Sequence, residues 1–496
     1  MEFRKSFYAG IFLVAASTLL LEITLTKIFS VIHSHYSAFL IVSTALFGYG
    51  ISGVVLSVSK RLEKISRDRL LFASSLLFGV TTVLCYRLML AVPLVIGEIF
   101  SSSLQMFYLA AAYLLLALPF FFSGLVIGVL LTGYTDRVNK LYFADLTGAA
   151  IGCFAIVLVI PFLGGSGTVL FAGILACLSA FAFVKKRTNF ALPSVAIVII
   201  ALFIPRAEQY FPSATKSQKR HFSNSIRGGT LYTGWSPAAR IDVVSSSPQV
   251  YTIWIDGGTC QSFMRGWNGK KKLSTRVGDL TERGLELPYK FMKDPNVLII
   301  GPGGGTEVLS TLKFKPAKIT GVELDPLITK IVLGHFSDFI GNLYTKPNVK
   351  LVNEEGRSFV RRSGELYDII QQKSNTHPMT VASGALNLTE SYLLTKEAFR
   401  EYLDHLKPDG YLTISRHGGA RLLIMAAEVL QERGIQDYWK RMILMAESSR
   451  RQVFLLKNSG ITPQELAYFD RFMKKSRMEP LYTPRMYRRE DHLFAR

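Results

Sequence analysis

The first 205 residues contain repeated runs of about 20 apolar residues, and no other feature constrains the fold as strongly. Charged residues are scarce there, with only 14 of the 57 Lys and Arg and 7 of the 36 Asp and Glu. A helix of about 20 apolar residues crosses the hydrocarbon core of a bilayer. The pattern predicts a multi-pass helical membrane domain over residues 1–205. Six spans are expected, near residues 8–30, 36–58, 70–96, 104–133, 143–164 and 167–184.

A seventh apolar run, Phe190 to Ile204, is shorter and contains Pro193, so it predicts either a thin span or a segment lying in the interface. Lys and Arg gather in alternate loops, which makes the N-terminus and Lys185 cytoplasmic by the positive-inside rule. A seventh span would place the rest of the chain outside. We expect a cytoplasmic C-terminal domain because it is built to bind a nucleotide, although hydropathy favours the other side.

Four ionisable residues fall within or at the ends of these apolar runs. They are Glu22, Lys27, Arg87 and Asp145. Charge at this depth is costly, so it marks either structural ion pairs and snorkelling side chains or a transport pathway. Both interpretations stay open. The four cysteines are too few and too scattered for a disulfide framework or a zinc cluster, and we expect no metal site.

After a linker at 206–228 the pattern changes to short alternating β runs, which predict a small β module over 229–290. Strand-like and helical runs then alternate over 291–458. This alternation predicts a doubly wound, mostly parallel sheet of seven strands whose last two strands form a hairpin. Residues 459–496 form a basic C-terminal tail, expected to contact lipid or to cover the site.

A glycine-rich turn follows the first strand of this sheet, Asn296 to Ile300, and opens a helix at Thr306. Its glycines let the backbone turn sharply and approach a ligand closely. The candidate cofactor-binding glycines are Gly301, Gly303, Gly304 and Gly305. The second strand ends in Glu323, about 20 residues further on, where a carboxylate accepts hydrogen bonds from ribose hydroxyls.

The third strand ends in a second acidic pair, Glu354 and Glu355. Ligands of open α/β sheets bind at the carboxyl ends of the strands, so three successive strand ends predict a nucleotide site. The first two features are shared with NAD-binding domains, and the third distinguishes them.

These motifs resemble the spermidine synthase superfamily, the polyamine aminopropyltransferases, over roughly residues 230–457. The matching runs are 297–307, 321–326, 354–357, 367–370 and 388–410. The resemblance implies a class I methyltransferase-like fold and, as cofactor, S-adenosylmethionine or its decarboxylated form. It also implies that the glycines shape the nucleoside loop, that Glu323 holds the ribose and that Glu355 lies beside the adenine. Gln261 and Glu282 would lie on the substrate side.

The fourth strand departs from the family pattern at its carboxyl end. Aminopropyltransferases place an aspartate there to attract the amine and help take its proton, whereas this chain has Lys373. A cation at that position repels polycationic amines. We therefore expect Lys373 and Gln372 to be the catalytic candidates, with Gln371 and Asn375 contacting a substrate that carries a carboxylate.

The resulting expectation is a membrane-anchored S-adenosylmethionine-dependent transferase that transfers methyl rather than aminopropyl groups to an unidentified small acceptor. Aminopropyl transfer is one alternative. A non-catalytic nucleoside-binding domain that regulates a membrane transporter is another. The net charge of +21 suits contact with membrane lipid, no nucleic-acid partner is expected, and homo-oligomerisation stays open.

Overall fold

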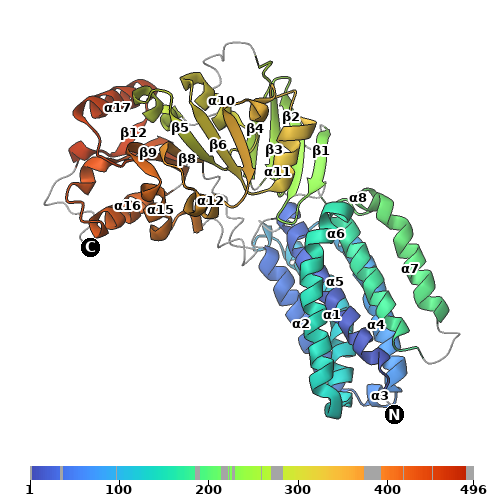
Figure 1. The fold of residues 1–496 in the computed structure, drawn as a ribbon. Helices are drawn as coiled ribbons and strands as arrows, with labels where there is room; N and C mark the ends of the chain where they lie inside the picture. Colours follow the sequence, from blue (N-terminus) through green and yellow to red (C-terminus); the bar gives the residue numbers. More distant parts are fainter. Residues whose placement is uncertain are drawn as a thin grey trace. The chain divides into compact units, whose positions relative to one another are not determined.

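The computed structural model describes residues 3–33, 37–95, 98–184, 190–213, 222, 224–225, 229–258, 260–269, 283–373, 392–416, 418–448 and 451–486. The chain divides into two compact units. The first contains the helical bundle and strand β1, and the second contains a large α/β sheet (Figure 1).

The N-terminal bundle consists of long apolar helices joined by short connections (Figure 1). Its helices are α1 (Ser6–Ile32), α2 (Ser37–Val58), α3 (Lys60–Glu63), α4 (Arg67–Met89), α5 (Ser103–Gly133), α6 (Val138–Phe181), α7 (Ala191–Phe203) and α8 (Ala207–Tyr210). Among the described residues, six helical segments are long and apolar enough to cross a membrane. The fifth of them, Thr135–Phe181, has 47 residues and is far longer than one crossing needs.

The first arm of α6 packs closely against α1. A Cβ added to Gly148 would collide with the carbonyl oxygen of Phe12, and one added to Gly152 would collide with that of Ala16. The contacts advance together along both helices, so the first arm runs parallel to α1. Small residues at such contacts let two membrane helices approach closely.

Helix α6 reverses direction at Gly164, whose φ of 69° and ψ of 179° are not helical. Beyond it, Gly165 lies against Ile28, and the Ser17 hydroxyl donates to the carbonyl of Ala172 at 2.7 Å. These contacts run backwards along α1, so the second arm is antiparallel to it. The two arms form a helical hairpin and correspond to the two separate spans expected from the sequence.

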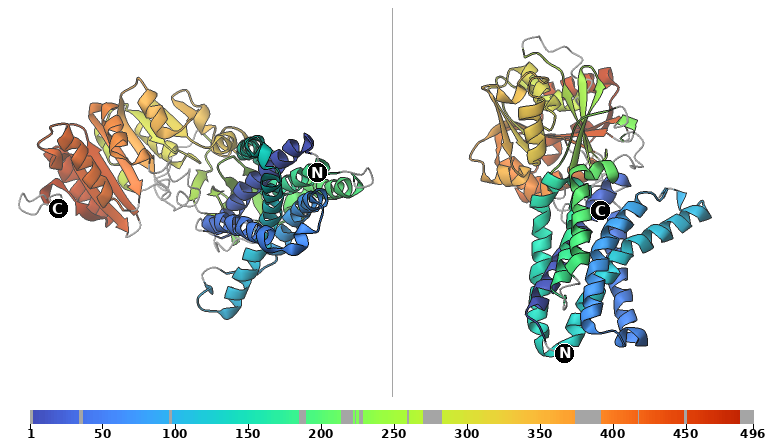
Figure 2. Two further views of the ribbon diagram at one scale, coloured as in Figure 1. Left: turned by 90° about the horizontal axis from the view of Figure 1, so that it is seen from below. Right: turned by 90° about the vertical axis from the view of Figure 1, so that its right-hand side faces the viewer.

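Helix α7 returns along the second arm of this hairpin. The rings of Phe181 and Phe190 stack with centroids 5.4 Å apart, and Gly173 faces Ile200. The two helices lie side by side in Figure 1 and again in Figure 2. Because α7 runs antiparallel to the second arm, it ends near the hairpin tip.

The small β module is a sheet of four strands in the order β1-β2-β3-β4. The strands are β1 (Thr230–Trp235), β2 (Arg240–Ser247), β3 (Val250–Ile255) and β4 (Cys260–Arg265). A tight turn at Asp256 and Gly257 joins β3 to β4, with positive φ at both residues. The sequence expectation of a short-stranded module closed by this turn agrees with these strands.

The large sheet has eight strands in the order β12-β10-β11-β9-β8-β5-β6-β7. The strands are β5 (Asn296–Ile300), β6 (Lys318–Glu323), β7 (Val349–Asn353), β8 (Tyr367–Lys373), β9 (Leu406–Arg416), β10 (Met442–Ser448), β11 (Arg451–Lys457) and β12 (Glu479–Tyr482). Strands β5 to β9 pair in parallel, whereas β11 pairs antiparallel with both β9 and β10. This is a class I methyltransferase-like fold. The chain order reverses between β5 and β8, which is where such sheets bind ligands.

Helices cover both faces of this sheet (Figures 1 and 2). The helices are α10 (Thr306–Thr311), α11 (Pro326–Lys330), α12 (Gly356–Arg362), α15 (Lys396–Asp404), α16 (Ala420–Glu432) and α17 (Pro463–Ser476). One core packs α12, α15 and α16 against the sheet through residues such as Val360, Phe399 and Val429. The other packs Phe469 and Met473 of α17 against the opposite face.

The C-terminal residues differ from the expected basic tail and from the expected count of seven strands. Residues after 458 form α17, whose capping box joins Thr462 and Glu465, and then β12, an eighth strand at the sheet edge beside β10. Buried Glu465 also accepts from Lys457 at 2.9 Å, which fixes α17 to β11. Lys474 and Lys475 of this region lie in the last turn of α17, and residues 487–496 lie outside the described part of the chain.

Candidate functional site at the carboxyl ends of the strands

The glycine-rich turn follows β5 and has a backbone that only glycine adopts easily. Gly301, Gly303 and Gly305 have φ values of 72°, 49° and 91°. The amide of Gly304 donates to the Ser262 hydroxyl at 2.9 Å, which ties the turn to β4. A Cβ at Gly303 would collide with that hydroxyl, so the turn has no room for side chains there. The sequence prediction of a tight glycine turn agrees with this geometry.

Glu323 lies at the end of β6 and is hydrogen-bonded to the glycine turn. Its Oε2 accepts from the Gly303 amide at 3.0 Å and its Oε1 from the Asp325 amide at 3.1 Å. The side chain is 7% exposed, and burial raises its pKa to about 7. The Tyr344 hydroxyl donates to the Gly303 carbonyl at 3.0 Å and adds a further hydrogen bond to the turn. The structure therefore joins two of the candidate cofactor-binding elements.

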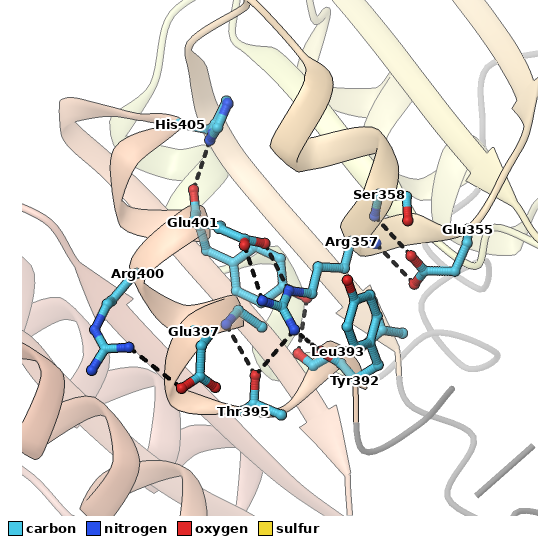
Figure 3. Close-up of polar contacts among 12 residues, drawn as sticks. Glu355, Arg357, Ser358, Tyr392, Leu393, Thr395, Glu397, Arg400, Glu401 and His405 are labelled. Carbon is cyan, nitrogen blue, oxygen red and sulfur yellow. Dashed lines mark hydrogen bonds and ion pairs between the residues drawn. The ribbon is translucent and has the colours of Figure 1, made fainter. Parts of the chain in front are cut away.

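The acidic pair after β7 has two different roles in the structure. Glu355 caps α12 by accepting from the amides of Arg357 at 3.0 Å and Ser358 at 2.7 Å (Figure 3). Glu354 forms an ion pair with the exposed Arg362. Capping fixes the orientation of the Glu355 carboxylate, while a surface ion pair contributes little to stability.

Arg357, which follows the acidic pair, was not singled out from the sequence and is almost fully buried. Its guanidinium pairs with Glu401 through two contacts of 2.7 and 3.0 Å and lies 4.1 Å from the ring centroid of Tyr392 (Figure 3). A bidentate pair of this kind is rigid and specific in geometry. It fixes α15 and the segment before it to α12, beside the third strand end.

The fourth strand end holds a buried ion pair. Lys373 Nζ lies 3.0 Å from Oε1 of Glu307, and the side chains are 15% and 3% exposed. The Thr306 hydroxyl donates to the second carboxylate oxygen at 2.9 Å. Sequence reasoning missed Glu307 because an acid just after a glycine turn is common at the start of a helix. Lys373 is thus compensated by a carboxylate from α10.

The two glutamines before Lys373 are buried in β8. Gln371 accepts from the Tyr289 hydroxyl at 2.8 Å, and Tyr289 also contacts Thr311. Gln371 is therefore part of the packing beneath the site. Gln372 is 3% exposed, and its Oε1 has no hydrogen-bond partner among the described residues. Buried polar atoms are usually hydrogen-bonded, so this oxygen is an exception among the described residues.

The remaining candidates are only partly described. Gln261 is exposed on β4, next to the Ser262 that contacts the glycine turn. Glu282 and Asn375 lie outside the described residues. Within the described part of the chain, no group of three or more His, Cys, Asp or Glu is placed to hold a metal ion.

Comparison with known protein families gives a direct match for this region. Residues 285–421 match the spermine/spermidine synthase domain. The chain carries a spermidine synthase domain. The matched residues run from just before β5 into α16, so they include the glycine turn, Glu323, the acidic pair and the Lys373 strand end of the synthase domain.

Curated relatives of the synthase domain are polyamine aminopropyltransferases. The protein of Korarchaeum cryptofilum is 30% identical over 162 residues, which cover 32% of this chain and 44% of the relative. That of Thermoplasma volcanium is 27% identical over 134 residues, covering 27% and 45%. That of Sulfolobus acidocaldarius is 27% identical over 123 residues, covering 24% and 38%. The chain spans less than half the length of these relatives.

Solved structures similar to this chain include spermidine synthases. The enzyme of Thermotoga maritima matches at 20% identity with a TM-score of 0.33, covering 48% of this chain and 75% of that one. A probable spermidine synthase of Corynebacterium glutamicum matches at 16% identity with a TM-score of 0.35, covering 51% and 90%.

Proposed function

We propose that this chain is a membrane-anchored aminopropyltransferase that uses decarboxylated S-adenosylmethionine. The observation that carries the proposal is the match of residues 285–421 to the spermine/spermidine synthase domain, together with relatives named polyamine aminopropyltransferase. The expectation of methyl transfer has no support from these relatives. That expectation depended mainly on Lys373.

The Lys373–Glu307 pair removes most of the argument against an amine substrate. An isolated lysine would repel a cationic amine, but here a carboxylate 3.0 Å away compensates its charge. The pair as a whole carries no net charge. The pair therefore neither repels nor attracts a cationic amine at this strand end, where aminopropyltransferases place a carboxylate.

The described residues suit the nucleoside half of the substrate. The glycine turn leaves room for close backbone approach, and the Glu323 carboxylate at the crevice has acceptor capacity beyond its two amide bonds. Buried Oε1 of Gln372 adds an unused acceptor at the adjoining strand. Decarboxylated S-adenosylmethionine supplies an aminopropyl carbon activated by a sulfonium. The acceptor amine loses a proton as the carbon–nitrogen bond forms and the carbon–sulfur bond breaks.

Product analysis tests this proposal. The full chain in detergent is incubated with decarboxylated S-adenosylmethionine and putrescine, and the products are identified by mass spectrometry. We expect spermidine and methylthioadenosine in equal amounts from the wild type and much less of both from Glu323→Ala. Methylated product from intact S-adenosylmethionine, or the absence of any transfer by a folded wild type, would contradict the proposal.

We further propose that α7 is a membrane crossing and that the chain leaves the bundle on the extracytoplasmic side. Five helical segments and the two arms of α6 make seven passes in the described residues. Arg4 bonds to Asp68 of α4 at 3.0 Å and to the Val184 carbonyl at 2.7 Å, so the N-terminus lies at the end where Lys and Arg gather. Residue 207 lies at the other end, near Gly167 and the hairpin tip. The positive-inside rule then favours an external synthase domain rather than the cytoplasmic one expected from nucleotide supply.

A further inference from the structure

Helix α7 stands at the edge of the bundle (Figure 1). Side chains of α7 and α4 line a groove between the two helices. The groove has a volume of about 480 Å³, and ten of its eleven lining residues are apolar. Val80 and Leu84 line it from α4, and Val195 and Ile199 from α7. Apolar surface of this kind, on a helix that faces the bilayer, contacts acyl chains rather than water.

Among the described residues that line the groove, the one charged residue lies at headgroup level. Arg87 follows Arg67, at the start of α4, by 20 residues, which is roughly 30 Å along a helix and equals the thickness of the hydrocarbon core. With Arg67 at one surface of the bilayer, Arg87 reaches the other. Its side chain is exposed and makes no hydrogen bond or ion pair with the described residues.

We propose that this groove binds one anionic phospholipid, with an acyl chain between α4 and α7 and the phosphate on the Arg87 guanidinium. An unpaired guanidinium beside an apolar groove complements a lipid that has a negative headgroup and an apolar tail. A zwitterionic lipid offers the same tail but carries an ammonium group close to its phosphate, which weakens the attraction to Arg87.

The site lies beside the segment through which the chain leaves the bundle. Phe211 lines the groove, stacks on Tyr86 with ring centroids 5.7 Å apart, and accepts through its carbonyl from the Ser166 hydroxyl at 2.8 Å. A bound lipid therefore packs against the connection that follows α8. This binding does not depend on the proposed transfer reaction.

Native mass spectrometry of the full chain tests the proposal. Detergent-purified protein is titrated with phosphatidylglycerol or phosphatidylcholine, and retained lipids are counted. We expect the wild type to retain more phosphatidylglycerol than phosphatidylcholine. In Arg87→Gln the ratio of the two should fall about fivefold, because one cation at a membrane surface contributes about 1 kcal/mol. Ala196→Phe fills the groove and is expected to lose both lipids.

Arg69→Gln is the matched control, because Arg69 is an exposed arginine on the same helix outside the groove. It should retain the wild-type preference. Equal binding of the two lipids by the wild type, or an unchanged preference in Arg87→Gln, would overturn the proposal. If Arg87→Gln fails to fold, the comparison of the two lipids on the wild type and the Ala196→Phe variant test the proposal instead. A folded Ala196→Phe protein that retains as much lipid as the wild type would also overturn the proposal.

Discussion

Glu323 is a buried carboxylate whose charge state changes near neutral pH. Burial raises its pKa to about 7, while the amides of Gly303 and Asp325 hold its two oxygens in place. Only the ionised form is a pure acceptor for ribose hydroxyls. Its position at the second strand end is readable from the sequence because it follows the glycine turn by about 20 residues. The burial that raises its pKa depends on tertiary packing, which the sequence motif does not reveal.

Nucleoside binding should therefore depend on pH through Glu323. Below a pKa of about 7 the carboxyl is protonated and loses acceptor capacity, so affinity should fall by up to about tenfold per pH unit on the acid side and level off above pH 7. Calorimetry with methylthioadenosine between pH 5.5 and 8.5 measures this. Glu323→Gln has no titrating group at this position and should give a flat, weaker profile. A wild-type profile equally flat would contradict the assignment.

Glu307 and Lys373 should behave as a single unit in stability measurements. Glu307→Gln removes the carboxylate that lies 3.0 Å from a mostly buried lysine, a change that costs about 3–5 kcal/mol in comparable buried pairs. Adding Lys373→Met to that variant removes the buried positive charge and should restore most of the loss. Thermal unfolding of the full chain in detergent compares the three proteins. If Glu307→Gln alone is as stable as the wild type, the ion pair is not buried as described.

At the scale of elements, the length of the apolar runs predicts the bundle, and the alternation of strand-like and helical runs predicts the central sheet. The exceptions have physical causes. The two spans expected around Gly164 form one long helix with a reversal, because two adjacent glycines let the chain fold back without a loop. Strand β12 was missed because four residues, mostly exposed, carry almost no hydrophobic pattern. It is specified instead by pairing with β10.

The α1–α6 contact gives a test of this packing. A leucine at Gly148 would drive its side chain into the Phe12 carbonyl and separate the helices, a change expected to cost about 1–3 kcal/mol or more. Gly50 is the control, since nothing lies within 4 Å of a Cβ placed there. Gly148→Leu should lower the melting temperature in detergent and Gly50→Leu should leave it nearly unchanged. Equal effects would argue against close α1–α6 packing.

For the whole molecule, the side on which the synthase domain lies depends on whether α7 crosses the membrane. A reporter active only outside the cytoplasm, fused after Arg496, should be active, whereas one fused after Lys186, in the basic connection between α6 and α7, should be inactive. The reverse pattern would contradict a seven-pass bundle with a cytoplasmic N-terminus. Sequence alone left this open because residues 190–204 are short for a span, and the antiparallel path of α7 along α6 is a tertiary feature.

The central claim is that the glycine turn and Glu323 form the adenosyl-sulfur half of an aminopropyltransferase site. Calorimetry of the full chain tests it most directly, with decarboxylated S-adenosylmethionine, intact S-adenosylmethionine and NAD as ligands. We predict that the decarboxylated form binds best, that NAD does not bind, and that Glu323→Ala weakens binding by about tenfold or more, as expected for lost hydrogen bonds to a charged group. Binding of NAD alone, or unchanged affinity in a folded Glu323→Ala protein, would contradict the account.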